Sequence, residues 1–122
     1  PPPGARVEYG SPETAPFPRT PSIAEGIMIA NPVRGRALLH ALGASNGGAV
    51  AIPEGEIRAA LLDAAHQGVY IEPTSATVVA ATRRLLEQGT ISSSDRVVML
   101  VTGNGLKATS AIADLLTEAS AG

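Results

Sequence analysis

The strongest chemical signal in the sequence is a hydroxyl that directly follows an apolar run. Residues 97–101 (Val-Val-Met-Leu-Val) carry no polar side chain, and Thr102 follows them at the head of the loop Gly103-Asn104-Gly105. An uninterrupted apolar run is typical of a strand that is covered on both faces. Open α/β sheets bind ligands beyond the carboxyl ends of such strands, so this loop is a candidate ligand site.

A second candidate segment places a carboxylate and two hydroxyls at the start of an expected helix. It is Glu72–Ala76 (Glu-Pro-Thr-Ser-Ala), and it follows the short apolar run 69–71. The same residues also have a purely structural interpretation. Thr74 and Ser75 can satisfy the unpaired amides of a helix start, and the glycine loop can be a simple turn. The residue pattern leaves both interpretations open.

Residue types exclude several classes of catalytic site. There are no cysteines, and His40 and His66 do not have the spacing of zinc ligands, so we expect no metal site. No Ser-His-Asp set suggests a nucleophile triad, and no Walker-type loop is present. Lys107 is the only lysine, so Schiff-base chemistry by this chain alone would have to use it. We assign no catalytic residue.

Length and composition favour one soluble, globular domain. The chain has 122 residues, of which 44% are hydrophobic, and a formal net charge of −2. Nothing suggests a basic face for nucleic acid or a polybasic membrane patch. No apolar run approaches the roughly 20 residues of a membrane span, and no signal peptide is visible. We therefore expect a cytoplasmic protein with no nucleic-acid or membrane partner.

Helix and strand signals alternate along most of the chain. Seven of the ten prolines lie at or before Pro21, which predicts an irregular leader over 1–21 and an α/β part over 22–122. The patterns predict helices over 22–30, from Pro32 to the stop at 46–48, and over 53–67, 73–88 and 109–119, with short strands over 49–52, 69–71 and 97–101. This alternation favours a three-layer architecture, a parallel sheet flanked by helices.

A sheet of three strands is thin, which suggests that the architecture is incomplete. Two of the three strands would lie at an edge, and the sequence supplies little to protect such edges. We infer that strands on another segment complete the sheet.

Several short motifs carry a family resemblance because they occur in a specific order. The segments Ser22–Ile27, Asn31-Pro32, Gly68–Ala76 and Arg96–Lys107 resemble the C-terminal part of the threonine synthase family. That family belongs to the tryptophan-synthase-β-like, or fold type II, pyridoxal-phosphate enzymes. The resemblance runs from about residue 22 to about residue 116, and it rests on Glu-Pro-Thr-Ser-Ala and Val-Thr-Gly-Asn-Gly-Leu-Lys occurring together.

The resemblance implies a lyase that uses pyridoxal 5'-phosphate to convert O-phosphohomoserine and water into threonine and phosphate. It implies that the Thr102 hydroxyl bonds the pyridine nitrogen and need not keep that nitrogen protonated. Gly103 would let the loop pass close to the ring, and Glu72 and Ser75 would border the cofactor cleft. Asn31 matches a turn on the substrate side of the active site.

Two parts of the family's cofactor site have no counterpart in the sequence. The lysine that holds the cofactor covalently and the loop that binds its phosphate lie far N-terminal to the matching region, and the leader 1–21 aligns poorly. The resemblance therefore implies a C-terminal fragment that is inactive alone and holds no covalent cofactor. Its expected partners are the missing N-terminal portion or further copies of the chain, with a small amino-acid substrate.

Three alternatives stay open. Threonine or serine dehydratases and diaminopropionate enzymes share much of this frame, so the substrate could differ. A non-catalytic α/β binding or assembly module would keep the ligand crevice and an exposed sheet edge. A generic phosphate-binding α/β domain could use the loop 102–105.

Overall fold

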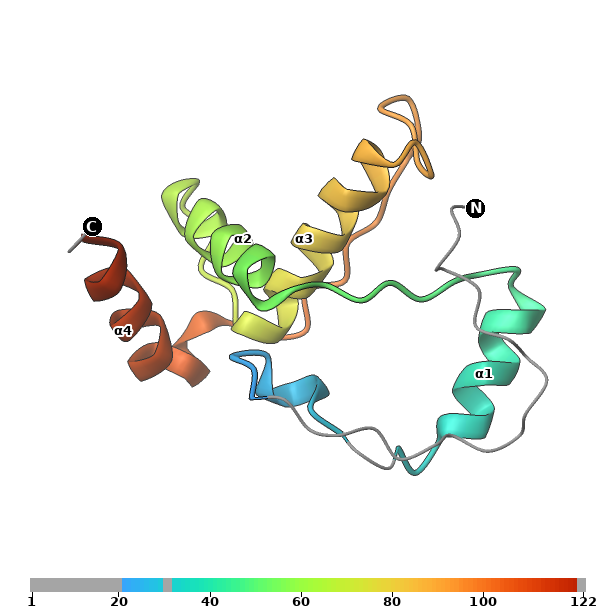
Figure 1. Cartoon of the computed structure of the whole chain (residues 1–122), viewed down its shortest axis with the longest axis horizontal. Helices are drawn as coiled ribbons and strands as arrows, with labels where there is room; N and C mark the ends of the chain where they lie inside the picture. Colours follow the sequence, from blue (N-terminus) through green and yellow to red (C-terminus); the bar gives the residue numbers. More distant parts are fainter. Residues whose placement is uncertain (1–20, 30–31, 121–122) are drawn as a thin grey trace.

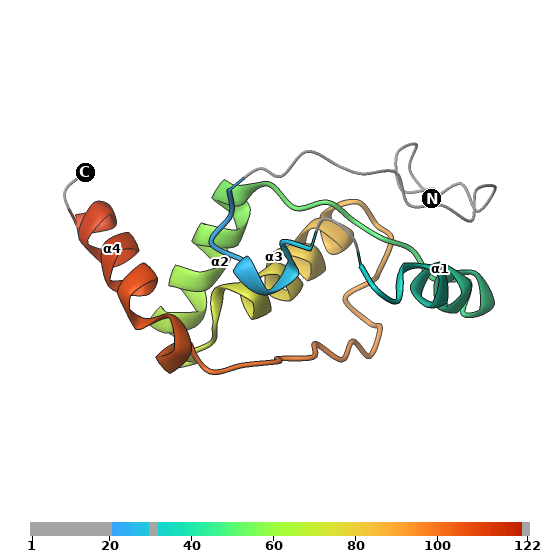
Figure 2. The same cartoon turned by 90° about the horizontal axis from the view of Figure 1, so that it is seen from below.

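A computed structural model of the chain describes residues 21–29 and 32–120. These residues form the 3-10 helix η1 (Glu25–Ile27), the helices α1 (Gly35–Ala44), α2 (Glu54–His66) and α3 (Pro73–Glu87), the 3-10 helix η2 (Gly105–Ala108) and the helix α4 (Thr109–Ser120). Helices α2 and α3 lie side by side, α4 lies beyond α2, and α1 stands apart (Figures 1 and 2). No helix among the described residues has the length and apolarity needed to cross a membrane.

The predicted parallel sheet is not present in the part of the chain that the structure describes. Segments 49–52 and 97–101 form no strand, and segment 69–71 contributes one antiparallel bridge, between Ile71 and Asn104. The run 97–101 is exposed, from 44% at Val97 to 86% at Val98. A strand needs a neighbour that takes its backbone hydrogen bonds. No described segment makes such bonds along 97–101.

The first two predicted helices begin later than the sequence indicated. The helix predicted over 22–30 is reduced to η1, and the predicted capping box is wrong. The Ser22 hydroxyl accepts the N–H of Ala24 at 3.1 Å, whereas a capping box requires the residue three positions on. Helix α1 begins at Gly35 and not at Pro32. Asn31, its predicted cap, lies outside the described residues.

The later helices match their predictions closely, because glycines end them as expected. Gly68 and Gly89 follow α2 and α3 with φ of 78° and 67°, a backbone region that favours glycine. After α2, the N–H of Gly68 donates to Ala65 O and that of Val69 donates to Ala64 O, both at 2.9 Å. This pair of bonds is the Schellman motif.

The core lies where α3 packs against α2, and α4 and the residues before η1 complete it. Small residues on α3 let the two helices approach closely, since Ala76 is fully buried and Ala80 is 3% exposed. The other buried apolar residues are Ala24, Ile57, Ala60, Leu61, Ala64, Ile71, Ile112 and Leu115. At the surface, Arg83 pairs with Asp63 at 2.6 Å and Arg84 pairs with Glu56 at 2.9 Å. These two ion pairs join α3 to α2 in addition to the apolar core.

Two glycine substitutions separate the role of backbone conformation from that of space. A β-carbon at Gly68 or at Gly55 would meet no atom within 4 Å, but only Gly68 has positive φ. We expect Gly68→Ala to lower the free energy of unfolding by about 1–2 kcal/mol. We expect Gly55→Ala, inside α2, to raise it by about 0.5–1 kcal/mol. Urea unfolding followed by circular dichroism measures both, and equal effects would contradict the assigned α2 terminus.

Candidate functional site

The two candidate segments predicted from the sequence meet at the start of α3. Backbone bonds hold the loop 102–105 against the residues that precede this helix. The Glu72 N–H donates to Gly103 O at 3.1 Å, and the Gly105 N–H donates to Tyr70 O at 3.1 Å. The bridge between Ile71 and Asn104 lies between these two bonds. The loop is therefore positioned by the chain that leads into α3.

Ser75 is the buried polar centre of this region. Its side chain is only 1% exposed. The Ser75 Oγ accepts the backbone N–H of Thr102 at 3.0 Å and that of Gly103 at 3.3 Å. It also lies 3.2 Å from Thr102 Oγ1. Ser75 therefore does not cap α3, which has no side-chain cap, but pairs the amides of the loop.

Thr102 and Glu72 extend this cluster toward solvent. Thr102 Oγ1 donates to Glu72 Oε1 at 2.9 Å. A β-carbon at Gly103 would overlap the carboxyl group of Glu72, so only glycine leaves room for that group. The structure thus brings together Thr102, Gly103, Glu72 and Ser75, the four residues predicted to lie at the cofactor. Their contact with a cofactor stays a prediction.

A cavity of about 830 Å³ opens beside the cluster, and Thr102 and Glu72 lie in its wall. Segments from η1, α2, α3, η2 and α4 contribute to the lining, which includes the charged residues Glu25, Glu54, Arg58, Glu72 and Lys107. Thr102 also borders a second hollow of about 520 Å³ beside residues 68–71. The Thr102 hydroxyl is therefore neither sealed in the core nor on a flat surface.

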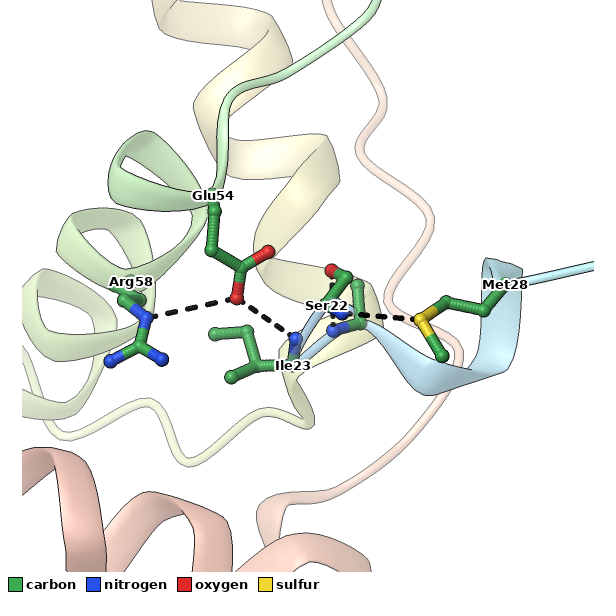
Figure 3. A network of polar contacts seen from close by, with 6 residues as sticks. Ser22, Ile23, Met28, Glu54 and Arg58 are labelled. Carbon is green, nitrogen blue, oxygen red and sulfur yellow. Dashed lines mark hydrogen bonds and ion pairs between the residues drawn. The ribbon is translucent and has the colours of Figure 1, made fainter. Parts of the chain in front are cut away.

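The segment 21–29 forms one wall of this cavity and is held by side chains from α2 and α3. Glu54 accepts the N–H of Ile23 at 2.9 Å and pairs with Arg58 at 3.7 Å (Figure 3). Thr74 Oγ1 accepts the N–H of Gly26 at 3.2 Å. The sequence does not predict these contacts, because no local pattern signals them: Ile23 and Glu54 lie 31 positions apart, and Gly26 and Thr74 lie 48 positions apart.

The other residues singled out in the sequence lie apart from the cluster or in the wall of the cavity beside it. His40 and His66 do not line the cavity, whereas Lys107 does. Asn31, predicted on the substrate side, lies outside the described residues. Within the described residues, no three side chains form a group that could hold a metal ion. What the cluster can do chemically is orient a ligand through hydrogen bonds at the cavity wall.

Comparison with known families agrees with the motifs. The sequence matches the family described as "Pyridoxal-phosphate dependent enzyme" over residues 2–103. The match begins inside the segment predicted as a leader, and the boundary of that leader stays a prediction. No solved structure matches the chain.

The chain is similar to several curated threonine synthases. The chain is 39% identical over 102 residues to threonine synthase of Methanocaldococcus jannaschii, which covers 83% of this chain and 23% of the relative. It is 34% identical over 113 residues to threonine synthase of Methanosarcina acetivorans, and this match covers 92% of this chain and 28% of the relative. It is 38% identical over 87 residues to threonine synthase of Halalkalibacterium halodurans, and this match covers 70% of this chain and 25% of the relative. The chain spans about a quarter of the length of these relatives.

These matches confirm the resemblance to threonine synthases that the ordered motifs indicated. They also support the predicted α/β class, although the described residues contain no sheet. Pyridoxal phosphate is the cofactor of the complete enzymes. This chain belongs to the pyridoxal-phosphate-dependent enzyme family.

Proposed function

We propose that this chain is the C-terminal part of a threonine-synthase-like lyase that converts O-phosphohomoserine and water into threonine and phosphate. One observation carries the proposal: the two family motifs converge, so that Ser75, Thr102 and Glu72 form one hydrogen-bonded cluster beside a cavity. The threonine synthases that match most of the chain support the same substrate.

The residues present fit one edge of the cofactor ring. Thr102 is exposed, and its oxygen retains hydrogen-bonding capacity at the cavity wall. The Ser75 bonds to the amides of Thr102 and Gly103 hold that oxygen in place before any ligand arrives. When bound, pyridoxal phosphate supplies an electron sink for bond cleavage in the amino acid, and the protein positions and tunes it.

The described residues hold and orient a ligand but supply no covalent anchor. Lys107 is the only lysine, and the resemblance places it after the Thr-Gly-Asn-Gly-Leu string and not at the anchoring position. We therefore propose that the chain alone is inactive and that an N-terminal portion supplies the anchoring lysine and the phosphate loop.

The exposed apolar run 97–101 is the surface that such a portion would cover. Val98 and Leu100 are 86% and 72% exposed, and their neighbours Val97, Met99 and Val101 are each more than two-fifths exposed. Covering such a side chain fully is worth roughly 1.5–3 kcal/mol. A run that is open on both sides fits a strand inside a sheet made with other segments. The partner is therefore a chain that donates strands.

Complementation tests this assembly. We expect the purified chain to form no threonine, and a mixture with the N-terminal three-quarters of the Methanocaldococcus jannaschii enzyme to release phosphate and threonine from O-phosphohomoserine. Val98→Asp should abolish the mixture's activity without unfolding the isolated chain, since Val98 is 86% exposed. Val98→Ile is the matched control and should keep it. Threonine formation by the chain alone would contradict the proposal.

Thr102 can be tested in the same mixture. Thr102→Val keeps the shape but removes the hydroxyl, and we expect turnover to fall by roughly 10–100-fold, as for a hydrogen bond whose remaining partner is left unsatisfied. Thr102→Ser should retain most of the turnover. The thermal midpoint of the isolated Thr102→Val chain separates the two roles, because a purely structural threonine would lower stability and turnover together.

A further inference from the structure

The exposed run 97–101 has the side-chain pattern of a strand that lacks a neighbour. Val98 and Leu100 are 86% and 72% exposed, whereas the other three residues of the run are 44–49% exposed. Exposure that alternates with a period of two is typical of an extended backbone, whose successive side chains point to opposite faces. In Figure 2 the orange stretch that contains this run passes along the outside of the molecule. The run therefore presents Val98 and Leu100 on one open face.

The backbone of the run is open to a second strand as well. No described segment exchanges backbone hydrogen bonds with residues 97–101. An unpaired, apolar strand is a template on which another chain can pair, and proteins prevent such pairing with charged residues and proline. The run contains neither a charged residue nor a proline. It can therefore accept a strand from another molecule.

The order of the residues favours one register for pairing two copies of this run. An antiparallel pair centred on Met99 brings Val97 of one copy opposite Val101 of the other. The same register brings Val98 opposite Leu100. Every residue of the run then lies opposite an apolar residue, and apolar side chains that meet across two strands stabilise the pair.

Other registers lose this match. A slip by one position sets Val101 opposite Arg96 or sets Val97 opposite Thr102, so an apolar residue lies opposite a polar one. Parallel pairing in register sets Arg96 opposite Arg96, and like charges that lie directly opposite are destabilising. The sequence therefore favours the antiparallel pair centred on Met99.

Charges beside the run complement one another in this register. Arg96 of one copy lies opposite Thr102 of the other, whose hydroxyl donates to Glu72 Oε1 at 2.9 Å. Residues opposite each other have β-carbons about 4.5–5.5 Å apart, so the long arginine side chain reaches that carboxylate. Arg96 is exposed, and within the described residues no ion pair uses Arg96 or Glu72. The two-fold symmetry of the pair makes this contact twice.

We propose that two copies of the chain pair through the run 97–101 as antiparallel strands, with Met99 at the two-fold axis and Arg96 of each copy at Glu72 of the other. Such an interface is self-complementary and closes at two copies. This partner goes beyond the proposed function, which assigns the run to an N-terminal portion. A strand inside a sheet has neighbours on both sides, so the second copy must leave before that portion encloses the run. This last consequence rests on the proposed function.

Single cysteines in the complete chain test the register, since the chain has no cysteine of its own. Residues directly opposite in an antiparallel pair have α-carbons about 4.5–5.5 Å apart, which is within the range of a disulfide. We expect Met99→Cys to link two chains in oxidised glutathione faster than Val97→Cys by a factor on the order of ten or more, because the two copies of position 97 lie about 13 Å apart. A mixture of Val97→Cys and Val101→Cys chains should link to each other. Non-reducing gels and mass spectrometry measure the products.

Sedimentation of the complete chain measures the pairing itself. We expect the average mass to rise from that of one chain toward that of two between about 1 µM and about 1 mM, the range of weak association. Val98→Asp should keep the chain monomeric, whereas Val98→Ile should still pair. Arg96→Glu should weaken the dimer by roughly tenfold, because it sets like charges against each other twice. Arg36→Glu, an exposed charge reversal on α1, should leave it unchanged. Circular dichroism shows which variants are folded.

A chain that stays monomeric at every concentration overturns the inference. Equal linking rates at positions 97 and 99 also overturn it, because they would indicate parallel or unspecific pairing, and assemblies larger than two copies would contradict a closed interface.

The linked Met99→Cys dimer separates this inference from the proposed function. In the complementation mixture it should be inactive while linked and should become active when dithiothreitol separates the chains. Activity of the linked dimer would overturn the exclusion between the two partners. A dimer that forms as expected, with no complementation by the unmodified chain, would contradict the proposed function alone.

Discussion

The site depends on two hydrogen bonds that the buried Ser75 Oγ accepts from backbone amides of the loop 102–105. Residues 97–101 have no strand neighbour among the described residues, so the loop that follows them cannot be positioned by a sheet. Ser75 does this together with the backbone bonds at Tyr70 and Glu72, because its Oγ pairs the N–H groups of Thr102 and Gly103. Both bonds are partly buried, so loss of the Ser75 oxygen would leave two loop amides without this partner and would cost stability. The loop therefore takes its position from helix α3.

Helix α3 can carry the loop because it packs against α2 and has buried residues in its first two turns. Pro73 occupies its first turn, and Gly89 ends it with positive φ. Ser75 and Ala76 are 1% and 0% exposed at its start, so the residue that pairs the loop sits next to one that packs against α2. The local sequence that starts the helix also delivers the carboxylate of Glu72 to the cavity. The first turn of α3 therefore contributes both to the core, through Ala76, and to the site, through Ser75 and the preceding Glu72.

What the sequence predicted well depends on local chemistry. Proline and glycine act within a few residues, so α2 and α3 were predicted to within about one residue at each end. The meeting of the segments 72–76 and 102–105 was also predictable, because the family resemblance assigns both motifs to the cofactor cleft. The strands were not, since a strand needs a partner that an apolar run such as 97–101 does not itself specify. The bonds from Glu54 to Ile23 and from Thr74 to Gly26 join distant residues without a local signal.

The proposed function divides the site between this chain and the rest of the enzyme. The Thr102 hydroxyl bonds Ser75 and Glu72, and both hydrogen bonds lie within the segment 72–103. On the proposed function, the covalent anchor and the phosphate loop come from segments outside this chain, which spans about a quarter of the length of its threonine synthase relatives. The apolar run 97–101 connects the two, because it leads directly into Thr102 and also exposes the surface that further strands would cover. On the proposed function, strand addition at this run would bring the remaining groups of the site to a hydroxyl that Ser75 and Glu72 already hold.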